Sequence, residues 1–317
     1  MKVLHIDTAT EFRGGQRQLA LLLAGRAGDA WAGVPEGPLA GEVGPPDVAL
    51  RPGNDPRNVF ALRGLPYDLV VAHTAHAHGV ALASGRPVVV HRRVDFAPRD
   101  RWKYRLVSGF VAVSTAVSDV LVNAGVPVRR VHVVHDGVDP LPVGVPVKGP
   151  RPLYGAMGAL VDHKGHRHLV EAMRHVPGHL WIAGEGPLRR DLESRILAAG
   201  LGDRVRLLGH IQDVGGFLAG IDVFVHPSVE EGLGQSVIEA MAAGCRVVAT
   251  RAGGVPEVLG DTGILVDPAD VPALAAALRE GLKLPRENGV ERAAAFSVAR
   301  MVEATGTAYS RIFEGVE

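Results

Sequence analysis

The stretch DVFVHPSVEEGLGQSVIEA (222–240) joins two different hydrophobic patterns across a short polar loop. Its first part, Val223 to Val225, is a continuous apolar run, which is typical of a strand buried on both faces. Pro227 ends that run, and beyond the loop the apolar residues at 237, 238, 241 and 242 recur with helical spacing. The stretch therefore predicts a strand, a loop and a helix in that order, which is the repeating unit of a parallel α/β sheet.

Short apolar runs of the same kind recur along the chain and alternate with amphipathic segments. They lie at residues 2–7, 68–73, 87–91, 109–114 and 131–139, and again at 153–158, 179–184, 204–209, 222–227, 245–250 and 263–267. Strands that alternate with helices indicate parallel sheets with helices on both faces. The predicted fold class is α/β, with two Rossmann-like domains whose parallel sheets face each other across a cleft.

The segment PLPVGVPVKGPRP (140–152) interrupts this alternation, because it has too many prolines for a helix or a central strand. We interpret it as the linker between a domain at 1–142 and a second at 151–317. A final helix is expected at about 297–317, and packing back on the first domain is left open for it. Since α/β folds bind ligands at the carboxyl ends of their strands, functional residues are expected there.

Composition excludes several classes of protein. Among the 317 residues, 34 are basic and 34 acidic, so net charge gives no reason to expect nucleic acid as a partner. The only cysteine, Cys245, cannot form an intramolecular disulfide, which fits a reducing compartment. The sequence has neither a signal-peptide pattern at Met1 nor a run of 18 apolar residues, and we therefore expect a cytoplasmic protein.

The loop before the helix at 235–242 carries the first chemical signal. The first turn of a helix has unpaired N–H groups and a partial positive charge, which attract phosphate. Gly232 and Gly234 have no Cβ, so the backbone can approach a ligand closely. Glu231 precedes the helix and Glu239 lies about one turn inside it, so the two carboxylates can bind hydroxyl groups on different parts of one ligand. The alternative is that both acids only complement the helix dipole.

The longer stretch HPSVEEGLGQSVIEAMAAGCRVVATRAGGVPEVLGDTGILVDP (226–268) resembles the signature of the retaining, two-Rossmann-domain (GT-B) glycosyltransferases of family 4. Glu231 and Glu239 match its E-x7-E pair. The likeness extends upstream through 202–214, 182–193 and 163–172, and more weakly to RGGQ (13–16). It implies an acceptor domain at 1–142 and a nucleotide-sugar donor domain at 151–317.

The resemblance also implies an activity. A family member would move a hexose, with retention, from a UDP-, GDP- or ADP-sugar to a hydroxyl of a glycan, a lipid-linked acceptor or a small molecule. It would need neither a metal ion nor another cofactor. In such a protein Glu239 holds the ribose, while Glu231 and the strand-end His91 contact the donor sugar. Lys164, in GALVDHKG (158–165), stabilises the departing β-phosphate.

The remaining donor-binding residues follow from the same resemblance and from glycine-rich turns. Two of them, in GHIQDV (209–214), should lie near the base, and the others should lie near the diphosphate. They are Arg13, Gly14, Gly15, His210, Ile211, Gly232, Leu233, Gly234 and Gln235.

The sequence departs from the family at one position. The motif usually has an arginine five residues before the lysine, and this chain has Ala159. One phosphate-binding cation is therefore missing, and Arg13 is a candidate substitute. The departure keeps open a non-catalytic nucleotide-sugar binding protein, and a GT-B sugar-nucleotide epimerase or a phosphorylase would share the fold.

The acceptor side gives weaker signals. Arg92 and Arg93 follow His91 and are candidates for an anionic acceptor, with a solvated loop as the alternative. The segment RDRWKYR (99–105) interleaves basic and aromatic residues, as a segment resting on an anionic membrane surface does. A partly packed helix with its cations in water is the alternative. A peripheral position at the inner face of the membrane is thus left open.

Histidines cluster twice, in AHTAHAHG and in DHKGHRH. The clusters comprise His73, His76 and His78, and His163, His166 and His168. Neither has a carboxylate or cysteine at a fixed helical spacing, so we expect no metal site.

Overall fold

The computed structural model describes residues 1–53, 55–97 and 101–315. The chain divides into two compact units, which are described separately below. Unit 1 comprises Met1–Gly137 together with the described residues from Ser297 onward, and unit 2 comprises Val138–Phe296. The proline-rich segment 140–152 contains neither helix nor strand, as predicted, and lies within unit 2, which begins at Val138.

In the described residues of unit 1, seven parallel strands form one sheet in the order β3-β2-β1-β4-β5-β6-β7. The strands are β1 (Val3–Asp7), β2 (Ala30–Gly33), β3 (Val48–Ala49), β4 (Leu69–Ala72), β5 (Val88–Arg92), β6 (Gly109–Ala112) and β7 (Val131–Val133). The helices are α1 (Gly14–Gly25), α2 (Ala40–Val43), α3 (Asn58–Ala61), α4 (Ala75–Leu82), α5 (Arg101–Arg105), α6 (Thr115–Asn123), the 3-10 turn η1 (Val128–Arg130) and α14 (Val298–Glu314).

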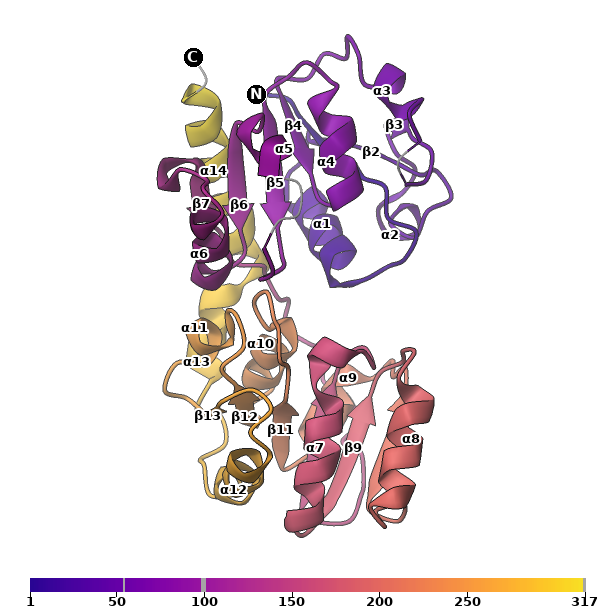
Figure 1. The fold of residues 1–317 in the computed structure, drawn as a ribbon, viewed down its shortest axis with the longest axis vertical. Coiled ribbons are helices and arrows are strands. Elements are labelled where there is room, and N and C mark those ends of the chain that lie inside the picture. The colour runs from indigo at the N-terminus through magenta and orange to yellow at the C-terminus, as the bar shows by residue number, and fades with distance from the viewer. Residues whose placement is uncertain (54, 98–100, 316–317) are drawn as a thin grey trace. The chain divides into compact units, whose positions relative to one another are not determined.

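Helix α14 belongs to unit 1 although it follows unit 2 in the sequence, as Figure 1 shows. It buries Met301, Tyr309 and Ile312 against alternate residues of the strands, among them Val71 and Val89. Because side chains alternate across a strand, the residues two positions further along point to this same face. Those residues include three histidines, His5, His73 and His91.

Unit 2 repeats the architecture with six parallel strands in the order β10-β9-β8-β11-β12-β13. They are β8 (Leu153–Met157), β9 (His179–Ala183), β10 (Val205–Gly209), β11 (Val223–His226), β12 (Arg246–Thr250) and β13 (Ile264–Val266). The α-helices are α7 (His166–Ala172), α8 (Arg189–Ala198), α9 (Val214–Gly220), α10 (Gln235–Ala242), α11 (Val255–Leu259), α12 (Val271–Gly281) and α13 (Val290–Ala293). Short 3-10 turns are η2 (Asp162–Lys164), η3 (Met173–His175) and η4 (Ala294–Phe296).

The predicted α/β class with two parallel, Rossmann-like sheets is confirmed, because each of the apolar runs proposed from the sequence overlaps an observed parallel strand. Two strands of unit 1, β2 and β3, were not predicted. The reason for β2 is its composition: Ala-Trp-Ala-Gly has no β-branched residue, so it does not look like a buried strand. The reason for β3 is its length of only two residues.

Candidate functional site

The carboxyl ends of β8 and β11 lie next to each other in unit 2, because these two strands pair in parallel. The loop after β8 carries Lys164 and the loop after β11 carries Glu231. A backbone hydrogen bond joins the loops, since the N–H of Val229 donates to the carbonyl of His163 over 2.7 Å. The sheet topology therefore brings together Lys164 and Glu231, which were predicted from two separate motifs.

Gly165 makes this approach of the two loops possible. Its φ is +65°, in the left-handed region that glycine adopts without penalty. A Cβ at this position would lie 2.0 Å from the carbonyl oxygen of Pro227, which is far inside van der Waals contact. Any other residue would push the loop after β8 away from the loop after β11.

Lys164 and Glu231 form an ion pair in which Nζ lies 2.6 Å from Oε2. Two more groups reach the same carboxylate oxygen: His226 Nε2 at 3.0 Å and the hydroxyl of Ser228 at 3.4 Å. Burial raises the pKa of Glu231, but the charge of Lys164 and the hydrogen bonds from His226 and Lys164 outweigh burial and hold it well below its usual range. Glu231 is therefore an anion at neutral pH.

Helix α10 begins directly after this carboxylate. Gly234 is its N-cap residue with φ +100°, and as a glycine it has no side chain with which to cap the helix. Gly232 and Leu233 are buried in the preceding loop, and Gln235 is half-buried at the first position of the helix. Glu239 lies within α10 and is 8% exposed. The start of α10 thus places backbone N–H groups beside Glu231, an arrangement that suits an anion.

The other residues predicted in unit 2 also follow the carboxyl ends of strands in this sheet. His210 is exposed and Ile211 half-buried, directly after the edge strand β10. Ala159 is exposed two residues after β8, so its methyl group leaves that position without a charge. Their proximity to a base or a phosphate stays a prediction.

In unit 1, the predicted phosphate-binding turn opens α1. Arg13 is the N-cap residue, and both Arg13 and Gly14 are exposed, while Gly15 is half-buried. The guanidinium of Arg13 pairs with Glu11, another exposed side chain. A phosphate that took Arg13 would have to displace this carboxylate, so the role of Arg13 stays a prediction.

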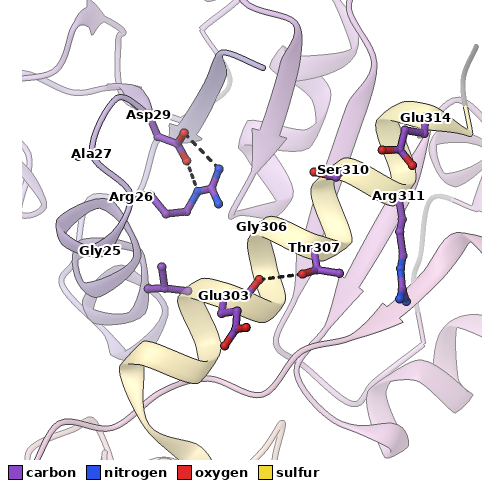
Figure 2. A pocket seen from close by; sticks show the side chains of 11 residues that line it. Gly25, Arg26, Ala27, Asp29, Glu303, Gly306, Thr307, Ser310, Arg311 and Glu314 are labelled. Atoms are coloured by element: carbon purple, nitrogen blue, oxygen red, sulfur yellow. Dashed lines mark hydrogen bonds and ion pairs between the residues drawn. The ribbon is translucent and has the colours of Figure 1, made fainter.

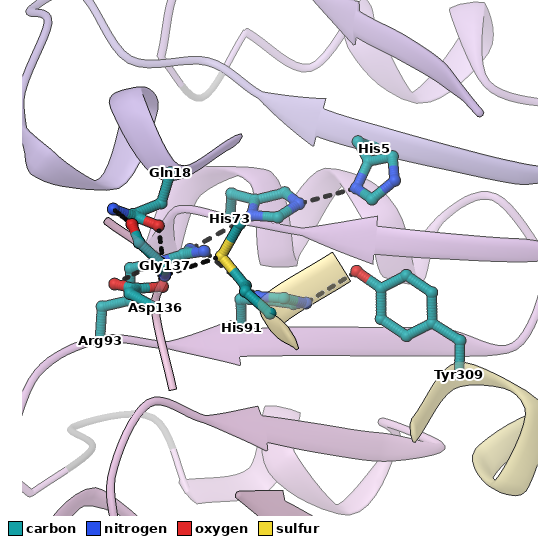
Figure 3. A network of polar contacts seen from close by, with 9 residues as sticks. His5, Gln18, His73, His91, Arg93, Asp136, Gly137 and Tyr309 are labelled. Carbon is teal, nitrogen blue, oxygen red and sulfur yellow. Dashed lines mark hydrogen bonds and ion pairs between the residues drawn. The ribbon is translucent and has the colours of Figure 1, made fainter. Parts of the chain in front are cut away.

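His91 lies in β5 and is buried, with both ring nitrogens in contact with polar groups (Figure 3). Nε2 lies 2.7 Å from the hydroxyl of Tyr309 on α14, and Nδ1 lies 3.3 Å from Arg93. Burial lowers the pKa of His91 well below its usual value, with a further contribution from the charge of Arg93. The ring is therefore neutral, and its predicted contact with a donor sugar is not tested by these distances.

Arg93 is the centre of this network. It pairs with Asp136 over 3.1 Å and also donates to Nδ1 of His73 over 3.2 Å. Because a guanidinium can only donate, Nδ1 of both His73 and His91 must accept, so their protons sit on Nε2. His73 then donates to His5 over 2.9 Å, and His5 to Asp29 over 3.1 Å. A partly buried chain of hydrogen bonds, each donated in the same direction, thus runs from Arg93 through His73 and His5 to Asp29.

Arg92, the other predicted acceptor-binding residue, points elsewhere. Its guanidinium donates to the hydroxyl of Tyr104 over 3.1 Å and to the carbonyl of Phe96, and it lies 5.0 Å from the centre of the Phe96 ring. Acceptor binding by Arg92 and Arg93 therefore stays a prediction, since both guanidinium groups have protein partners in this structure.

The proposed membrane segment 99–105 is only partly described, because residues 99 and 100 lie outside the described ranges. Trp102, in the short helix α5, is 61% exposed, and Tyr104 stacks on Phe110. In the part of the chain that the structure describes, no helix combines the length and the apolar composition needed to cross a membrane. Within those same ranges, no group of three or more His, Cys, Asp or Glu side chains is placed to hold a metal ion.

A groove of about 740 Å³ lies in unit 1 between the end of α1 and helix α14 (Figure 2). Its walls carry the ion pair of Arg26 with Asp29, and polar side chains of α14 such as Glu303, Thr307 and Arg311. None of the residues predicted from the sequence lines it.

Sequence reasoning missed His226, which contacts Glu231, and Ser236, which contacts His226. The ring of His226 lies between Glu231 and Ser236, with Nδ1 3.1 Å from the hydroxyl of Ser236. It also missed Tyr309, the partner of His91. The available signal for His226 was a polar residue closing an otherwise apolar strand, five positions before the acid.

Two family models match the chain. The model described as "Glycosyltransferase Family 4" matches residues 13–140, and that described as "Glycosyl transferases group 1" matches residues 151–283. Together they account for most of the chain, one largely in each unit.

Individual relatives agree with the models. The chain is 30% identical over 251 residues to a 2-deoxystreptamine glucosyltransferase of Streptomyces kanamyceticus, a match covering 71% of this chain and 63% of that protein. It is 37% identical over 132 residues to the lipopolysaccharide core biosynthesis glycosyltransferase LpsE of Rhizobium meliloti (strain 1021), covering 41% and 39%. These matches span less than two thirds of either relative's own length.

Among solved structures, Anabaena Alr3699/HepE in complex with UDP-glucose is similar with a TM-score of 0.82, over 98% of this chain and 100% of that one. Sequence identity is 21%, so this likeness concerns the fold. The folds of both units, the two family models and these relatives agree, and the chain belongs to the GT-B glycosyltransferases of group 1 and Family 4.

Proposed function

We propose that this protein transfers a sugar from a nucleoside diphosphate donor to a hydroxyl acceptor. The observation that carries the proposal is the pairing of Lys164 with Glu231 beside the start of α10. An ammonium group, an anionic carboxylate and the start of a helix lie together at the carboxyl ends of two adjacent strands, β8 and β11. These are the groups that a departing diphosphate and a polar sugar ring need.

The proposed roles follow from the charges. Lys164 and the backbone N–H groups at 232–235 bind the diphosphate, whose negative charge grows as the glycosidic bond breaks. Glu239 accepts hydrogen bonds from the ribose, and Glu231 from the donor sugar. Lys164 is paired with Glu231 in this structure, so the diphosphate must compete for the ammonium group when the donor arrives.

We propose that the reaction retains the anomeric configuration and uses no metal ion. The bond between the anomeric carbon and the β-phosphate oxygen breaks, and a bond to the acceptor oxygen forms on the same face. The acceptor proton passes to the departing phosphate oxygen, so the charges balance without a further group. Lys164 supplies the positive charge that a metal ion would supply elsewhere.

The similar proteins support the nature of the donor. One relative is named a glucosyltransferase, and structural neighbours are named as complexes with UDP and UDP-glucose. We therefore propose a UDP-sugar as the first donor to test, with GDP- and ADP-sugars as the other members of the panel.

The test measures released nucleotide from each donor with and without a panel of hydroxyl acceptors. We expect release that rises with acceptor, together with a product in which the sugar is linked α from an α-linked donor. Binding without release would indicate a nucleotide-sugar binding protein. Conversion without an acceptor would indicate an epimerase, and a requirement for free phosphate would indicate a phosphorylase.

We also propose that the protein works in the cytoplasm and contacts the inner face of the membrane through the segment 99–105. Support comes from the exposed ring of Trp102 beside basic residues. Co-sedimentation with anionic liposomes at low salt, lost at high salt, is expected. No difference between anionic and neutral liposomes would overturn this part of the proposal.

A further inference from the structure

One oxygen of Glu231 has two nitrogen neighbours, Lys164 Nζ and His226 Nε2, and these two side chains differ in mobility. Lys164 has a long side chain that is 21% exposed, and Nζ reaches Oε2 from the loop after β8. His226 is 1% exposed and is the last residue of β11, so its ring is fixed by the sheet. The lysine can leave Glu231 for a ligand, whereas the histidine cannot.

The ring of His226 is held at both nitrogens. Nε2 lies 3.0 Å from Oε2 of Glu231, and Nδ1 lies 3.1 Å from the hydroxyl of Ser236 on α10. The backbone carbonyl of His226 accepts from Thr250 of β12 over 3.2 Å, which fixes the strand end as well. A serine hydroxyl can donate to Nδ1, which leaves the ring proton on Nε2 and directs that N–H at Oε2 of Glu231.

This arrangement matters if the diphosphate draws Lys164 away. A carboxylate that is 14% exposed would then lose its strongest partner while remaining largely buried. A buried carboxylate that loses a cationic partner takes up a proton more readily, and a protonated Oε2 would no longer accept hydrogen bonds from a sugar. The hydrogen bond from His226 remains to oppose this.

We propose that His226 is a positioning residue that keeps Glu231 ionised and oriented toward the donor sugar once Lys164 binds the diphosphate. Ser236 holds the ring of His226 in the orientation that this task requires. The inference rests on the proposed glycosyl transfer and adds to it a residue that acts through Glu231.

Three other polar residues near this site, His166, Ser228 and Thr250, differ from His226. His166, the first residue of α7, is buried, and burial together with the charges of His226 and Lys164 lowers its pKa to about 4, so it is neutral at working pH. Ser228 contributes a hydroxyl at 3.4 Å, and Thr250 donates to backbone carbonyls instead. Lys164 and His226 both lower the pKa of Glu231, and of the two only His226 is fixed by the sheet.

The kinetic test compares two substitutions, His226→Leu and His226→Gln, in the full chain. Glutamine offers an N–H near the place of Nε2, whereas leucine offers none. For His226→Leu we expect kcat to fall about tenfold to a hundredfold, as for loss of a hydrogen bond to a charged group, with the donor KM little changed. The acid limb of the kcat profile should move to higher pH. His226→Gln should recover most of both effects.

Equal losses in His226→Leu and His226→Gln, or an unshifted acid limb in His226→Leu, would overturn the positioning role. A purely structural role would lower the melting temperature of both variants without separating their pH profiles. Calorimetric binding of UDP by each variant shows whether the phosphate site is intact.

A second measurement needs no turnover. In ¹⁵N-histidine spectra of the full chain, the His226 signal is assigned by its loss in His226→Gln. A protonated Nε2 supports the arrangement, and an unprotonated Nε2 overturns it. If the wild-type chain transfers no sugar from any donor, the proposed function fails, and this spectrum still decides whether His226 donates to Glu231.

Discussion

The charge of Glu231 is set by neighbours that come from distant parts of the chain. Lys164 lies 67 positions before it in the sequence, yet Nζ and Oε2 are 2.6 Å apart. Removing one partner of such a pair leaves the other charge partly desolvated, which is usually worse than never having the pair. The site is therefore sensitive to single substitutions on either side.

Replacement of Lys164 is the direct test of the phosphate role. Lys164→Ala should lower kcat/KM by on the order of 3 kcal/mol, or roughly a hundredfold or more, as for loss of one transition-state charge stabiliser. Steady-state kinetics with the accepted donor measures this. Lys283, whose Nζ pairs with the exposed Glu280 over 2.7 Å, gives the control Lys283→Ala, which should leave kcat/KM unchanged. Unchanged turnover in Lys164→Ala would remove this lysine from the mechanism.

A second prediction concerns a single atom, the hydroxyl oxygen of Tyr309, and its contribution to stability. It lies 2.7 Å from Nε2 of His91 in the buried face of unit 1, so Tyr309→Phe leaves a buried ring N–H without an acceptor. The free energy of unfolding should fall by about 1–3 kcal/mol. Denaturant unfolding followed by far-UV circular dichroism measures it.

Unit 2 offers a matched control for Tyr309→Phe. The hydroxyl of Tyr154 is also buried, and within the described residues it has no hydrogen-bond partner. Tyr154→Phe should therefore leave stability unchanged or raise it, because an unsatisfied polar atom is removed. Equal losses for the two variants would show that ring packing, and not the contact with His91, is responsible.

At this scale the sequence named candidate residues in unit 2 but did not predict the contacts between them. Lys164 and Glu231 were assigned to different parts of a ligand, and their mutual contact depends on backbone geometry that no motif states. His226 was treated as the end of a strand, because a single histidine in an apolar run carries no chemistry until its neighbours in space are known. The network around Arg93 was hidden for the same reason.

At the scale of elements, the hydrophobic pattern predicted most strands because parallel strands buried on both faces give continuous apolar runs. The edge region of unit 1 escaped this rule. β2 contains Trp31 between two alanines and pairs with β1 through its backbone, so its side chains carry little of the signal. A strand that is held mainly by backbone pairing cannot be predicted from the hydrophobic pattern of its side chains.

The close approach of the loop after β8 to the loop after β11 depends on Gly165. Gly165→Ala should lower the free energy of unfolding by more than the roughly 1–2 kcal/mol of left-handed strain, because the new Cβ also meets the Pro227 carbonyl at 2.0 Å. Binding of UDP should weaken as well, since Lys164 moves with the loop. Denaturant unfolding and calorimetry measure the two effects.

Gly79 of α4 is the control for Gly165→Ala. Among the described residues, a Cβ added there meets nothing within 4 Å, so Gly79→Ala should stabilise the helix by about 0.5–1 kcal/mol. If Gly165→Ala proved as well tolerated as Gly79→Ala, the close approach of the two loops would not be required.

At the scale of the whole molecule, the order of the chain and the order of the units differ. Unit 1 is closed by α14, which lies after all of unit 2 in the sequence. The amphipathic pattern of the last helix shows which of its faces is buried but not which unit it packs against, and this is why its docking was left open.

This topology predicts unequal folding of the two halves when the chain is divided. Residues 138–296 expressed alone should fold cooperatively, because the core of unit 2 is made within that segment. Residues 1–137 alone should lack fixed packing, since the apolar face covered by Tyr309 and Ile312 would be exposed to water. A peptide of residues 297–315 should restore near-UV circular dichroism and abolish dye binding to apolar surface. Cooperative unfolding of 1–137 at full stability without the peptide would show that α14 is dispensable for the fold of unit 1.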